Sequence, residues 1–270
     1  METVRTEVRA GVMTVTLDAP PINMIGPELV RDIVALLDRV NTDGDVRVVV
    51  FQSADPDFFV AHVDLTKVAE YTAEAAKAGG PGDASLGMLW YALANTPAIT
   101  IAKLRGRARG AGSELALACD MRFGARENLV LGQPEVGFAI TPGAGGVQHL
   151  ARLLGRGRAM EVVLSSNDFD AELAERYGWI NRAVPDADLD EFVDSLATRI
   201  ASFAPDAVRV AKQAINEVCL PAADAIRADA VRFQSLVRTP EAQSRAKHLF
   251  VEGFQTRGDL EHDLGARLSP

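Results

Sequence analysis

The sequence predicts an α/β fold with a covered sheet and a helical C-terminal part. Two segments, 46–51 and 98–104, are almost continuously apolar, which is typical of strands buried on both faces. The second is followed by a glycine-rich turn and an alanine-rich helix at 111–119. From about residue 145 onward, apolar residues recur at helical spacing. This alternation of strand, turn and helix indicates an α/β core.

The first forty residues predict a hairpin followed by a helix. Residues 3–17 alternate between apolar and polar types, which favours two short strands that turn at Ala10. Pro20 and Pro21 end the ladder, because proline lacks the N–H that a ladder needs. Pro27 suits the first turn of a helix. The apolar face of that helix consists of Leu29, Val30, Ile33, Leu36, Leu37 and Val40.

Two more short strands and six more helices are predicted further along the chain. The strands are expected at 121–124 and 129–131. The helices are expected at 145–154, 158–165, 171–177, 189–203, 206–219 and 221–237. Asp188 and Glu191 have the spacing of an N-cap and its capping-box partner. Residues 69–85 combine helix formers with glycines and are interpreted as a partly helical, mobile connection over a site.

The composition predicts a cytoplasmic globular protein. The 270 residues carry a net charge of −9, which opposes electrostatic capture of nucleic acid or anionic lipid. Cys119 and Cys219 are too few for a disulfide scaffold and are expected to be reduced. The N-terminus lacks the apolar stretch of a signal peptide, and no run approaches the ~18 apolar residues of a membrane span. We therefore expect neither a membrane nor a nucleic-acid partner.

Motifs for several other chemistries are absent from the sequence. No serine stands in a G-x-S-x-G setting, and there is neither a GxxxxGK(S/T) loop nor a GxGxxG fingerprint after a strand. The four histidines do not pair at metal-ligand spacing. Asp186, Asp188 and Asp190 alternate like a calcium loop, but Glu191 stands where such a loop requires glycine. We interpret this cluster as a helix N-terminus and predict no metal site.

The turn before the helix at 111–119 is a candidate anion-binding site. Gly110, Ala111 and Gly112 are small residues at a helix start, where N–H groups lack internal partners. Such a turn binds a phosphate, or an oxygen that becomes negative during a reaction. Glu114, about one turn further on, is placed to act as a base toward water or a carbon acid. The alternative is a structural glycine turn with a solvent-facing glutamate.

Glu135 is the second candidate carboxylate. It follows Pro134 in the apolar stretch VLGQPEVGFAI. Burial there would raise the pKa of its carboxyl group, which suits proton donation near neutral pH. The alternative is a glutamate on an edge strand that points to water. Two carboxylates beside free amides would suffice for proton transfers around an activated carbonyl.

Three segments together resemble the crotonase superfamily, also called the enoyl-CoA hydratase/isomerase family. They are FFVAHVDL at 58–65, GRARGAGSELALACD at 106–120, and LGQPE at 131–135 leading to TPGAGG at 141–146. The resemblance runs from PIN at 21–23 through GWINRAVP at 178–185 and covers nearly the whole chain. GxELALxCD, and GQPE followed by TPGAGG, are much more specific than a lone glycine motif.

The resemblance implies a crotonase-like superhelix of repeated ββα units. Residues 1–200 would form this core and contain the active site. Residues 201–270 would be a helical C-terminal segment that helps to form trimers. The expected assembly is a homotrimer or a dimer of trimers.

The resemblance also implies roles for individual residues. The two oxyanion amides fall on Ala61 and Ala111, and the thioester oxygen of an acyl-CoA would sit between them. Glu114 would activate the water that adds at C3, and Glu135 would protonate C2 of the enolate. Gly143 matches a family glycine whose amide lies near that water. Further substrate-binding residues are expected to be His62, Val63, Asp64, Leu65 and Gly112.

The function implied by the resemblance is that of an enoyl-CoA hydratase. It would add water syn across the 2,3-double bond without a metal or redox cofactor, with coenzyme A only as part of the substrate. Members limited to isomerisation usually keep one glutamate, so two glutamates favour hydration. The alternatives are a Δ3,Δ2-enoyl-CoA isomerase, another crotonase reaction such as thioester hydrolysis or decarboxylation, and a non-catalytic acyl-CoA-binding protein.

The sequence departs from the family pattern at a few positions. His62 replaces the usual glycine of A-G-x-D, and its imidazole is expected beside the adenosine or at the trimer surface. The alternatives are that it narrows the pocket, contacts the acyl group or donates a proton. Ala111 replaces the middle glycine of G-G-G, and Arg109 stands where an apolar residue is common. One extra residue is attributed to a longer turn at 125–128.

Overall fold

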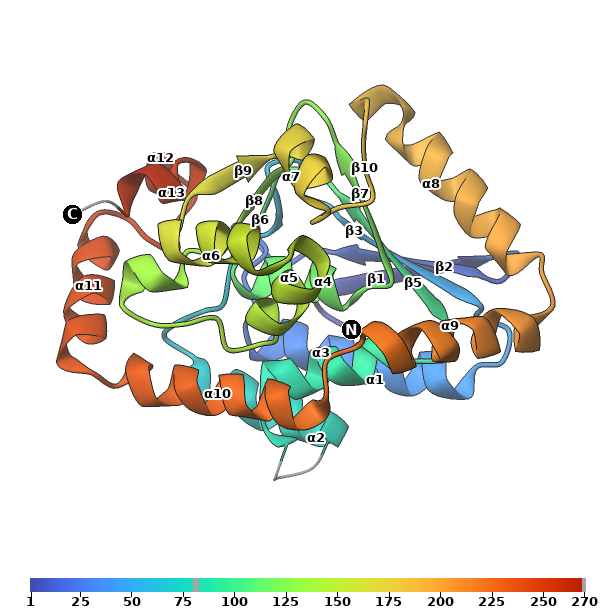
Figure 1. Ribbon diagram of the computed structural model, residues 1–270, viewed down its shortest axis with the longest axis horizontal. Helices are drawn as coiled ribbons and strands as arrows, with labels where there is room; N and C mark the ends of the chain where they lie inside the picture. Colours follow the sequence, from blue (N-terminus) through green and yellow to red (C-terminus); the bar gives the residue numbers. More distant parts are fainter. Residues whose placement is uncertain (80–82, 269–270) are drawn as a thin grey trace.

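The computed structural model, which describes residues 1–79 and 83–268, contains two β-sheets surrounded by helices (Figure 1). The larger sheet has the strand order β1-β2-β3-β5-β7-β10, and the smaller has the order β4-β6-β8-β9. The strands of the larger sheet are β1 (Val4–Arg9), β2 (Val12–Leu17), β3 (Val48–Ser53), β5 (Ile99–Leu104), β7 (Met121–Ala125) and β10 (Arg182–Val184). Those of the smaller sheet are β4 (Phe58–Val60), β6 (Arg107–Arg109), β8 (Val130–Gly132) and β9 (Asp168–Asp170).

Three consecutive ββα units build the core, which confirms the predicted α/β class and its repeat. In each unit, one strand of each sheet is followed by helix. The helices of these units are α2 (Val68–Gly79) and α3 (Leu86–Ala94), then α4 (Ala111–Ala118), then a 3₁₀ helix (Glu135–Phe138) with α5 (Gly146–Leu154) and α6 (Arg156–Ser165). Strands β2, β3, β5, β7 and β10 pair in parallel, and parallel neighbours require such crossover connections.

The N-terminal elements match the prediction closely. Strands β1 and β2 pair antiparallel around Ala10, and α1 (Pro27–Thr42) begins at the expected proline. All six residues of its predicted apolar face are buried. Strand β3 begins at Val48, two residues later than predicted. Val46 still belongs to the preceding turn, because its N–H donates to the carbonyl of Asp43.

Strand β5 and the first four residues of β3, in the middle of the larger sheet, are buried on both faces. Val49 and Phe51 of β3 belong to the main apolar core between the sheets and α1 to α7. Val48 and Val50 point the other way, into a second apolar cluster against Leu189 and its neighbours on α8 (Asp186–Ala201). This double coverage is the reason why the strand is apolar at successive positions.

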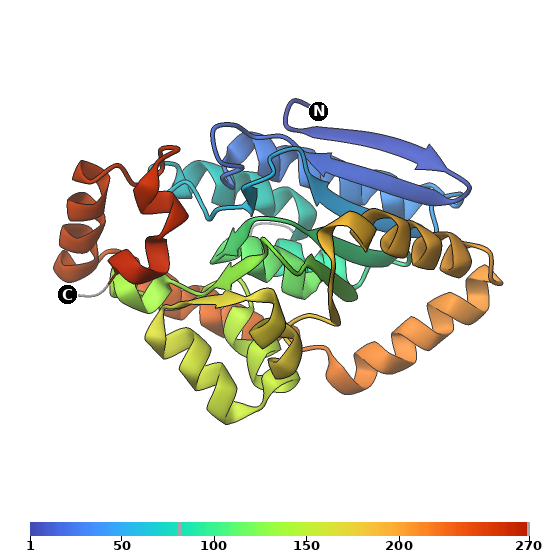
Figure 2. The same ribbon diagram turned by 90° about the horizontal axis from the view of Figure 1, so that it is seen from above.

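The C-terminal half is helical, as predicted. Its remaining helices are α7 (Ala171–Tyr177), α9 (Pro205–Cys219), α10 (Ala223–Val237), α11 (Pro240–Val251), α12 (Asp259–His262) and α13 (Leu264–Arg267). The view from above places α11 to α13 at one end of the molecule and α8 and α9 at the other (Figure 2). The prediction that Asp188 is an N-cap was wrong, because α8 begins at Asp186. In the predicted 69–85 connection, 68–79 are helical, while 80–82 lie outside the described residues.

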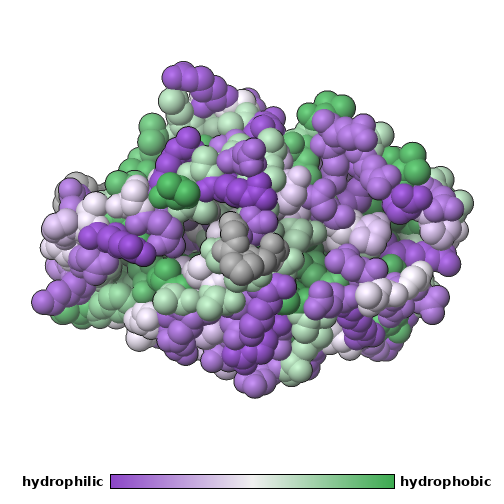
Figure 3. Space-filling view, turned by 90° about the horizontal axis from the view of Figure 1, so that it is seen from below, coloured by the Kyte–Doolittle hydropathy of each residue, from purple (hydrophilic) through white to green (hydrophobic). Residues whose placement is uncertain are grey.

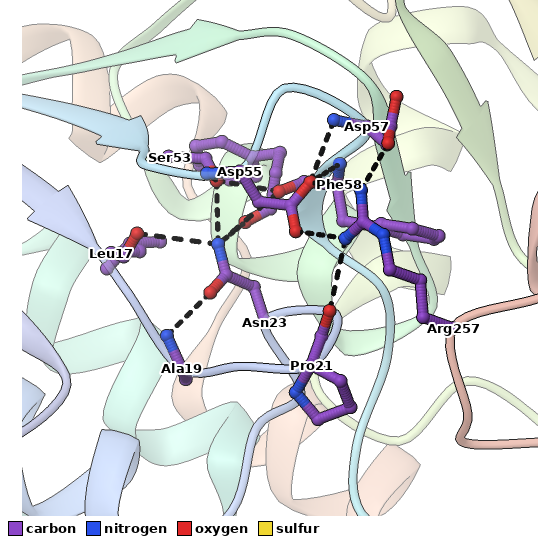
Figure 4. A network of polar contacts seen from close by, with 10 residues as sticks. Leu17, Ala19, Pro21, Asn23, Ser53, Asp55, Asp57, Phe58 and Arg257 are labelled. Atoms are coloured by element: carbon purple, nitrogen blue, oxygen red, sulfur yellow. Dashed lines mark hydrogen bonds and ion pairs between the residues drawn. The ribbon is translucent and has the colours of Figure 1, made fainter.

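A polar network joins the N-terminal loop, the start of β4 and the C-terminal segment (Figure 4). Asn23 is buried, and its Oδ1 accepts from the N–H of Ala19 at 2.6 Å. Its Nδ2 donates to Ser53 Oγ at 2.6 Å and to the carbonyl of Phe58 at 3.3 Å. Arg257 reaches from the C-terminal segment to the carboxylates of Asp55 and Asp57 and to the carbonyl of Pro21. These contacts fix the chain where it enters β4.

Candidate active site

A cavity of about 330 Å³ lies where the first turn of α4 faces α2, α3 and α10. Glu114, Glu135 and the backbone of Ala111 form part of its wall. The C-terminal side chains Phe254 and Leu264 form another part. Residues beyond 200 therefore contribute to the site, whereas the division of the chain at residue 200 stays a prediction.

Glu114 projects from the first turn of α4 and is 2% exposed. Its Oε1 accepts hydrogen bonds from the N–H groups of Ala144 at 2.9 Å and Gly146 at 2.8 Å. Burial raises the pKa of its carboxyl group to about 7, although the two backbone hydrogen bonds oppose the shift. Near neutral pH the group therefore exchanges readily between its acid and base forms.

Glu135 begins the 3₁₀ helix after β8 and is also buried. Its Oε2 has no hydrogen-bond partner among the residues that the structure describes. Burial, followed by repulsion from the charge of Glu114, raises the pKa of Glu135 well above its ordinary value. Two carboxyl groups in one apolar cavity thus favour a state in which Glu135 holds its proton while Glu114 titrates.

The raised pKa of Glu114 predicts a pH-dependent cost to stability. A carboxyl group with a raised folded-state pKa contributes its full stability below its unfolded pKa and loses it as the pH rises through about 7. We expect Glu114→Gln to increase the free energy of unfolding at pH 8 by about 3 kcal/mol, because glutamine stays neutral and accepts the same two bonds. The gain should shrink toward pH 5. Chemical denaturation at both pH values checks this, and a variant less stable than wild type at pH 8 contradicts it.

The first turn of α4 presents the predicted amide of Ala111. Gly110, at φ +51°, directs the chain from β6 into the helix. The carbonyl of Gly110 accepts the N–H of Glu114 at 2.9 Å. Because N–H and C=O point in opposite directions across a trans peptide, the N–H of Ala111 points out of the helix start. Ala111 lines the cavity, so this amide is available to a ligand.

The loop after β4 presents a second amide, but at Val63 rather than at Ala61. The carbonyl of His62 accepts the N–H of Ile25 at 2.8 Å, so the N–H of Val63 in the same peptide points away from Ile25. Val63 lines the cavity. Ala61 is fully buried and its N–H is directed at the carbonyl of Ile22, 3.4 Å away. This geometry disagrees with the sequence-based assignment of Ala61 to the oxyanion hole.

Of the other predicted substrate-binding residues, Leu65 and Gly143 line the cavity. Gly112 instead packs against the backbone of Val60, where a Cβ would lie 2.2 Å from the carbonyl oxygen. The glycine is thus required by the close approach of α4 to β4. Asp64 caps the following turn, because its Oδ1 accepts the N–H of Thr66 at 2.9 Å. Both residues shape the site from behind its wall.

The side chain of His62 contacts the chain's own C-terminal segment and is buried, so it does not lie at a trimer surface, while the expected placement beside adenosine stays a prediction. The ring is 5% exposed, lines the cavity, and stacks on Phe254 with ring centroids 4.5 Å apart. Its Nε2 lies 2.9 Å from Oε1 of Glu261. Arg109 is fully buried and forms a two-bond ion pair with Asp168 at 2.7 Å. Two of the residues that depart from the family pattern, His62 and Arg109, thus contact other parts of the same chain.

Several residues of the site were missed by the sequence reasoning. Tyr71 of α2 is buried and lines the cavity. Burial and the charges of Glu114 and Asp64 raise the pKa of its hydroxyl. Phe254 and Glu261 come from the far end of the chain. No local motif marks these residues, although Tyr71 lies one helical turn before the buried Ala75, which indicates an inward face.

Within residues 1–79 and 83–268, no three His, Cys, Asp or Glu side chains form a group that would hold a metal ion. No helix in the same part of the chain is long and apolar enough to cross a membrane.

The chain is similar to known proteins over most of its length. The family model described as enoyl-CoA hydratase/isomerase matches residues 7–257. A short-chain-enoyl-CoA hydratase of Clostridium acetobutylicum is 35% identical over 212 residues, which cover 78% of this chain and 79% of that protein. The crystal structure of a proposed enoyl-CoA hydratase of Streptomyces avermitilis is 63% identical and superposes with a TM-score of 0.98, covering 99% of this chain and 96% of that one.

A more distant solved structure shows the same fold. The enoyl-CoA hydratase of Bacillus anthracis is 26% identical and gives a TM-score of 0.73 over 97% of this chain and 100% of that one. The family model alone spans far more than half of the residues. The sequence resemblance is therefore confirmed over nearly the whole chain, and the protein belongs to the enoyl-CoA hydratase/isomerase family of the crotonase superfamily.

Proposed function

We propose that the protein is an enoyl-CoA hydratase, which adds water syn across the 2,3-double bond of a 2-enoyl-CoA. The observation that carries the proposal is that two buried carboxyl groups, Glu114 and Glu135, share one cavity with the amides of Val63 and Ala111. The names of the Clostridium acetobutylicum and Streptomyces avermitilis relatives support the same reaction.

In the proposed reaction, the ionised carboxylate of Glu114 takes a proton from water as the water oxygen bonds to C3. The electron pair of the double bond moves into the thioester, whose oxygen becomes an enolate held by the Val63 and Ala111 N–H groups. The enolate collapses as C2 takes the proton of Glu135. A proton then passes from Glu114 to Glu135 and restores both groups, so the sum is the addition of one water.

These four groups account for every bond that changes, and coenzyme A enters only as part of the substrate. The raised pKa values of both glutamates place one base and one acid in the cavity near neutral pH. A Δ3,Δ2-enoyl-CoA isomerase needs one glutamate to shuttle a proton, so it is the second candidate. Turnover of a 3-enoyl thioester that survives the loss of one glutamate would favour it.

Crotonyl-CoA tests the reaction directly. Loss of the enoyl-thioester absorbance together with a product heavier by one water is the expected result. A flat trace despite measurable binding of the thioester would contradict the proposal and favour a non-catalytic acyl-CoA-binding protein or another reaction of the superfamily.

Removal of one amide tests the oxyanion hole. Ala111 is the first residue of α4, a position that tolerates proline because its N–H has no helical partner. We expect Ala111→Pro to fold and to lower kcat on crotonyl-CoA by about 10²-fold. Ala223→Pro is the matched control, since Ala223 is the first residue of α10, follows extended backbone and does not line the cavity. Full activity of Ala111→Pro would rule this amide out of the site.

The proposal includes a homotrimer or dimer of trimers in the cytoplasm. Helix α9 contacts the core through the buried Lys212, while Val210, Ile215 and Val218 are 53%, 63% and 83% exposed. Hydrophobic residues are exposed among hydrophilic ones on the side of the molecule that carries α9 and α10 (Figure 3). An apolar helix face of this kind favours contact with another subunit, which analytical ultracentrifugation checks. The two cysteines, which form no disulfide, support a reducing location.

A further inference from the structure

The imidazole of His62 is held by hydrogen bonds at both nitrogens. Nδ1 lies 2.9 Å from the carbonyl oxygen of Val63. Nε2 lies 2.9 and 3.1 Å from the two carboxylate oxygens of Glu261. A carbonyl oxygen and a carboxylate are hydrogen-bond acceptors, so each ring nitrogen faces an acceptor. The His62 ring and the Glu261 carboxylate are almost completely shielded from solvent.

Glu261 is itself fixed by its surroundings. Its side chain is fully buried, and its Oε1 also accepts the N–H of Gln255 at 2.7 Å. Burial raises the pKa of this carboxyl group, but the contacts with His62, the Gln255 N–H bond and the charge of Arg109 together outweigh burial and leave the pKa below its ordinary value. Arg109 donates to the backbone carbonyl of Glu261 and binds Asp168 on β9. The carboxylate that meets His62 is thus anchored to the smaller sheet.

The contacts of His62 fix the two peptides on either side of Val63. The peptide before Val63 is held by the bond from Ile25 N–H to the His62 carbonyl at 2.8 Å. The peptide after Val63 is held by His62 Nδ1 and by Gln255 Nε2, each 2.9 Å from the Val63 carbonyl oxygen. Both donors to this oxygen depend on Glu261, through the His62 ring and the Gln255 N–H. The direction of the Val63 N–H is therefore coupled to the C-terminal segment.

We propose that His62, oriented by Glu261, is a positioning residue that aims the Val63 N–H at the thioester oxygen of the substrate. The inference rests on the proposed acyl-CoA chemistry of the same cavity. The side chain acts through the backbone of its neighbour and takes no proton from the substrate. A displacement of the amide by a fraction of an ångström weakens its hydrogen bond to the developing enolate, and hence the stabilisation of the transition state.

The test replaces the buried pair of His62 and Glu261 by apolar groups of similar size. Such replacements often leave stability nearly unchanged, so the double variant His62→Phe with Glu261→Leu is expected to fold. The probe is butyryl-CoA labelled with carbon-13 at the thioester carbonyl, which binds but has no double bond to hydrate. Hydrogen bonds to the carbonyl oxygen move its carbon resonance downfield. We expect the double variant to lose at least half of the wild-type downfield shift on binding.

Kinetics with crotonyl-CoA provide the second measurement. The double variant should lower kcat about tenfold with KM changed less than about threefold, because the interaction lost is made mainly in the transition state. Glu261→Gln keeps a hydrogen-bonding side chain beside Nε2 and should recover most of the lost carbonyl shift and kcat. Arg257→Gln is the control, since it removes contacts of the same C-terminal segment with Asp55 and Asp57 but none with Val63.

The outcomes separate this inference from the proposed function. If wild type does not shift the carbonyl resonance of bound butyryl-CoA, the proposed oxyanion hole fails. If wild type shifts it and the double variant keeps both that shift and kcat, the positioning role of His62 is overturned. An equal loss in Arg257→Gln would also overturn it, because C-terminal docking alone would then explain the effect. If the double variant does not fold, Gln255→Leu, which removes the other side-chain donor to the Val63 carbonyl, is held to the same criteria.

Discussion

Glu135→Gln is expected to lower kcat for hydration of crotonyl-CoA by about 10³-fold while it leaves the affinity for a saturated acyl-CoA within about threefold of wild type. Glutamine fills the same volume in the cavity but has no proton to give to C2. The carboxyl group of Glu135 is suited to this role because burial and the charge of Glu114 keep its pKa high, so that it holds a proton near neutral pH.

Isotope exchange distinguishes this role from a structural one. In deuterated water, the wild-type protein should exchange the C2 protons of butyryl-CoA, because Glu135 also removes the proton in the reverse direction. Glu135→Gln should lose this exchange. The matched control is Glu161→Gln, an exposed carboxylate that binds the hydroxyl of Tyr177 and lies outside the cavity. Near-full hydration by Glu135→Gln would remove the assignment of the acid.

Glu114→Gln is expected to lower kcat for hydration to a comparable extent, by about 10³-fold, because glutamine cannot take a proton from water. No other described carboxylate that lines the cavity is held by the Ala144 and Gly146 amides and could replace Glu114 as the base. The variant should nevertheless retain slow exchange at C2, since Glu135 remains. Loss of exchange in this variant and its retention in Glu135→Gln would reverse the two roles.

The pH dependence of wild type follows from the same pKa values. Below about pH 7 the carboxylate of Glu114 gains a proton and is lost as a base, so kcat/KM should rise with pH through this region. At higher pH, kcat/KM should fall when Glu135 loses its proton. A profile that is flat between pH 5 and 8 would contradict the assignment of Glu114 as the base. The same ionisation is the origin of the stability cost predicted above for pH 8.

Local pattern was sufficient for most of the fold. The pattern repeats along the whole element in each case, so a local stretch of sequence is enough to predict it. This holds for the alternation in β1 and β2, the continuous apolar runs in β3 and β5, and the apolar face of α1. The three-residue strands β4, β6, β9 and β10 were not predicted, because so short a strand carries no period and forms only where a neighbour supplies its hydrogen bonds. The start of α8 was misplaced because the sequence contains several acidic residues that suit a first helical turn.

The sequence predicted the acid–base residues of the site, but not which backbone amide of the loop after β4 faces the cavity. Glu114, Glu135 and Ala111 stand in segments whose residue types and spacing point to acid–base chemistry at a helix start, and all three line one cavity. The N–H of Ala61 is directed at the carbonyl of Ile22, whereas the N–H of Val63 points away from Ile25, which binds the His62 carbonyl of the same peptide. These two contacts decide which of the two amides faces the cavity. Those partners lie about forty residues earlier in the chain, so no pattern around the loop distinguishes the two amides.

The sequence by itself determined the α/β class, the family and the pair of glutamates, because these depend on residue types at short spacing. Only the tertiary structure decided which loop amide faces the cavity, what His62 contacts, and that the wall is completed by Phe254 and Leu264. The physical reason is the range of the interactions. Periodicity and helix starts are set by neighbours within a few residues, whereas Glu261 meets His62 across 199 positions, which only the folded chain brings together.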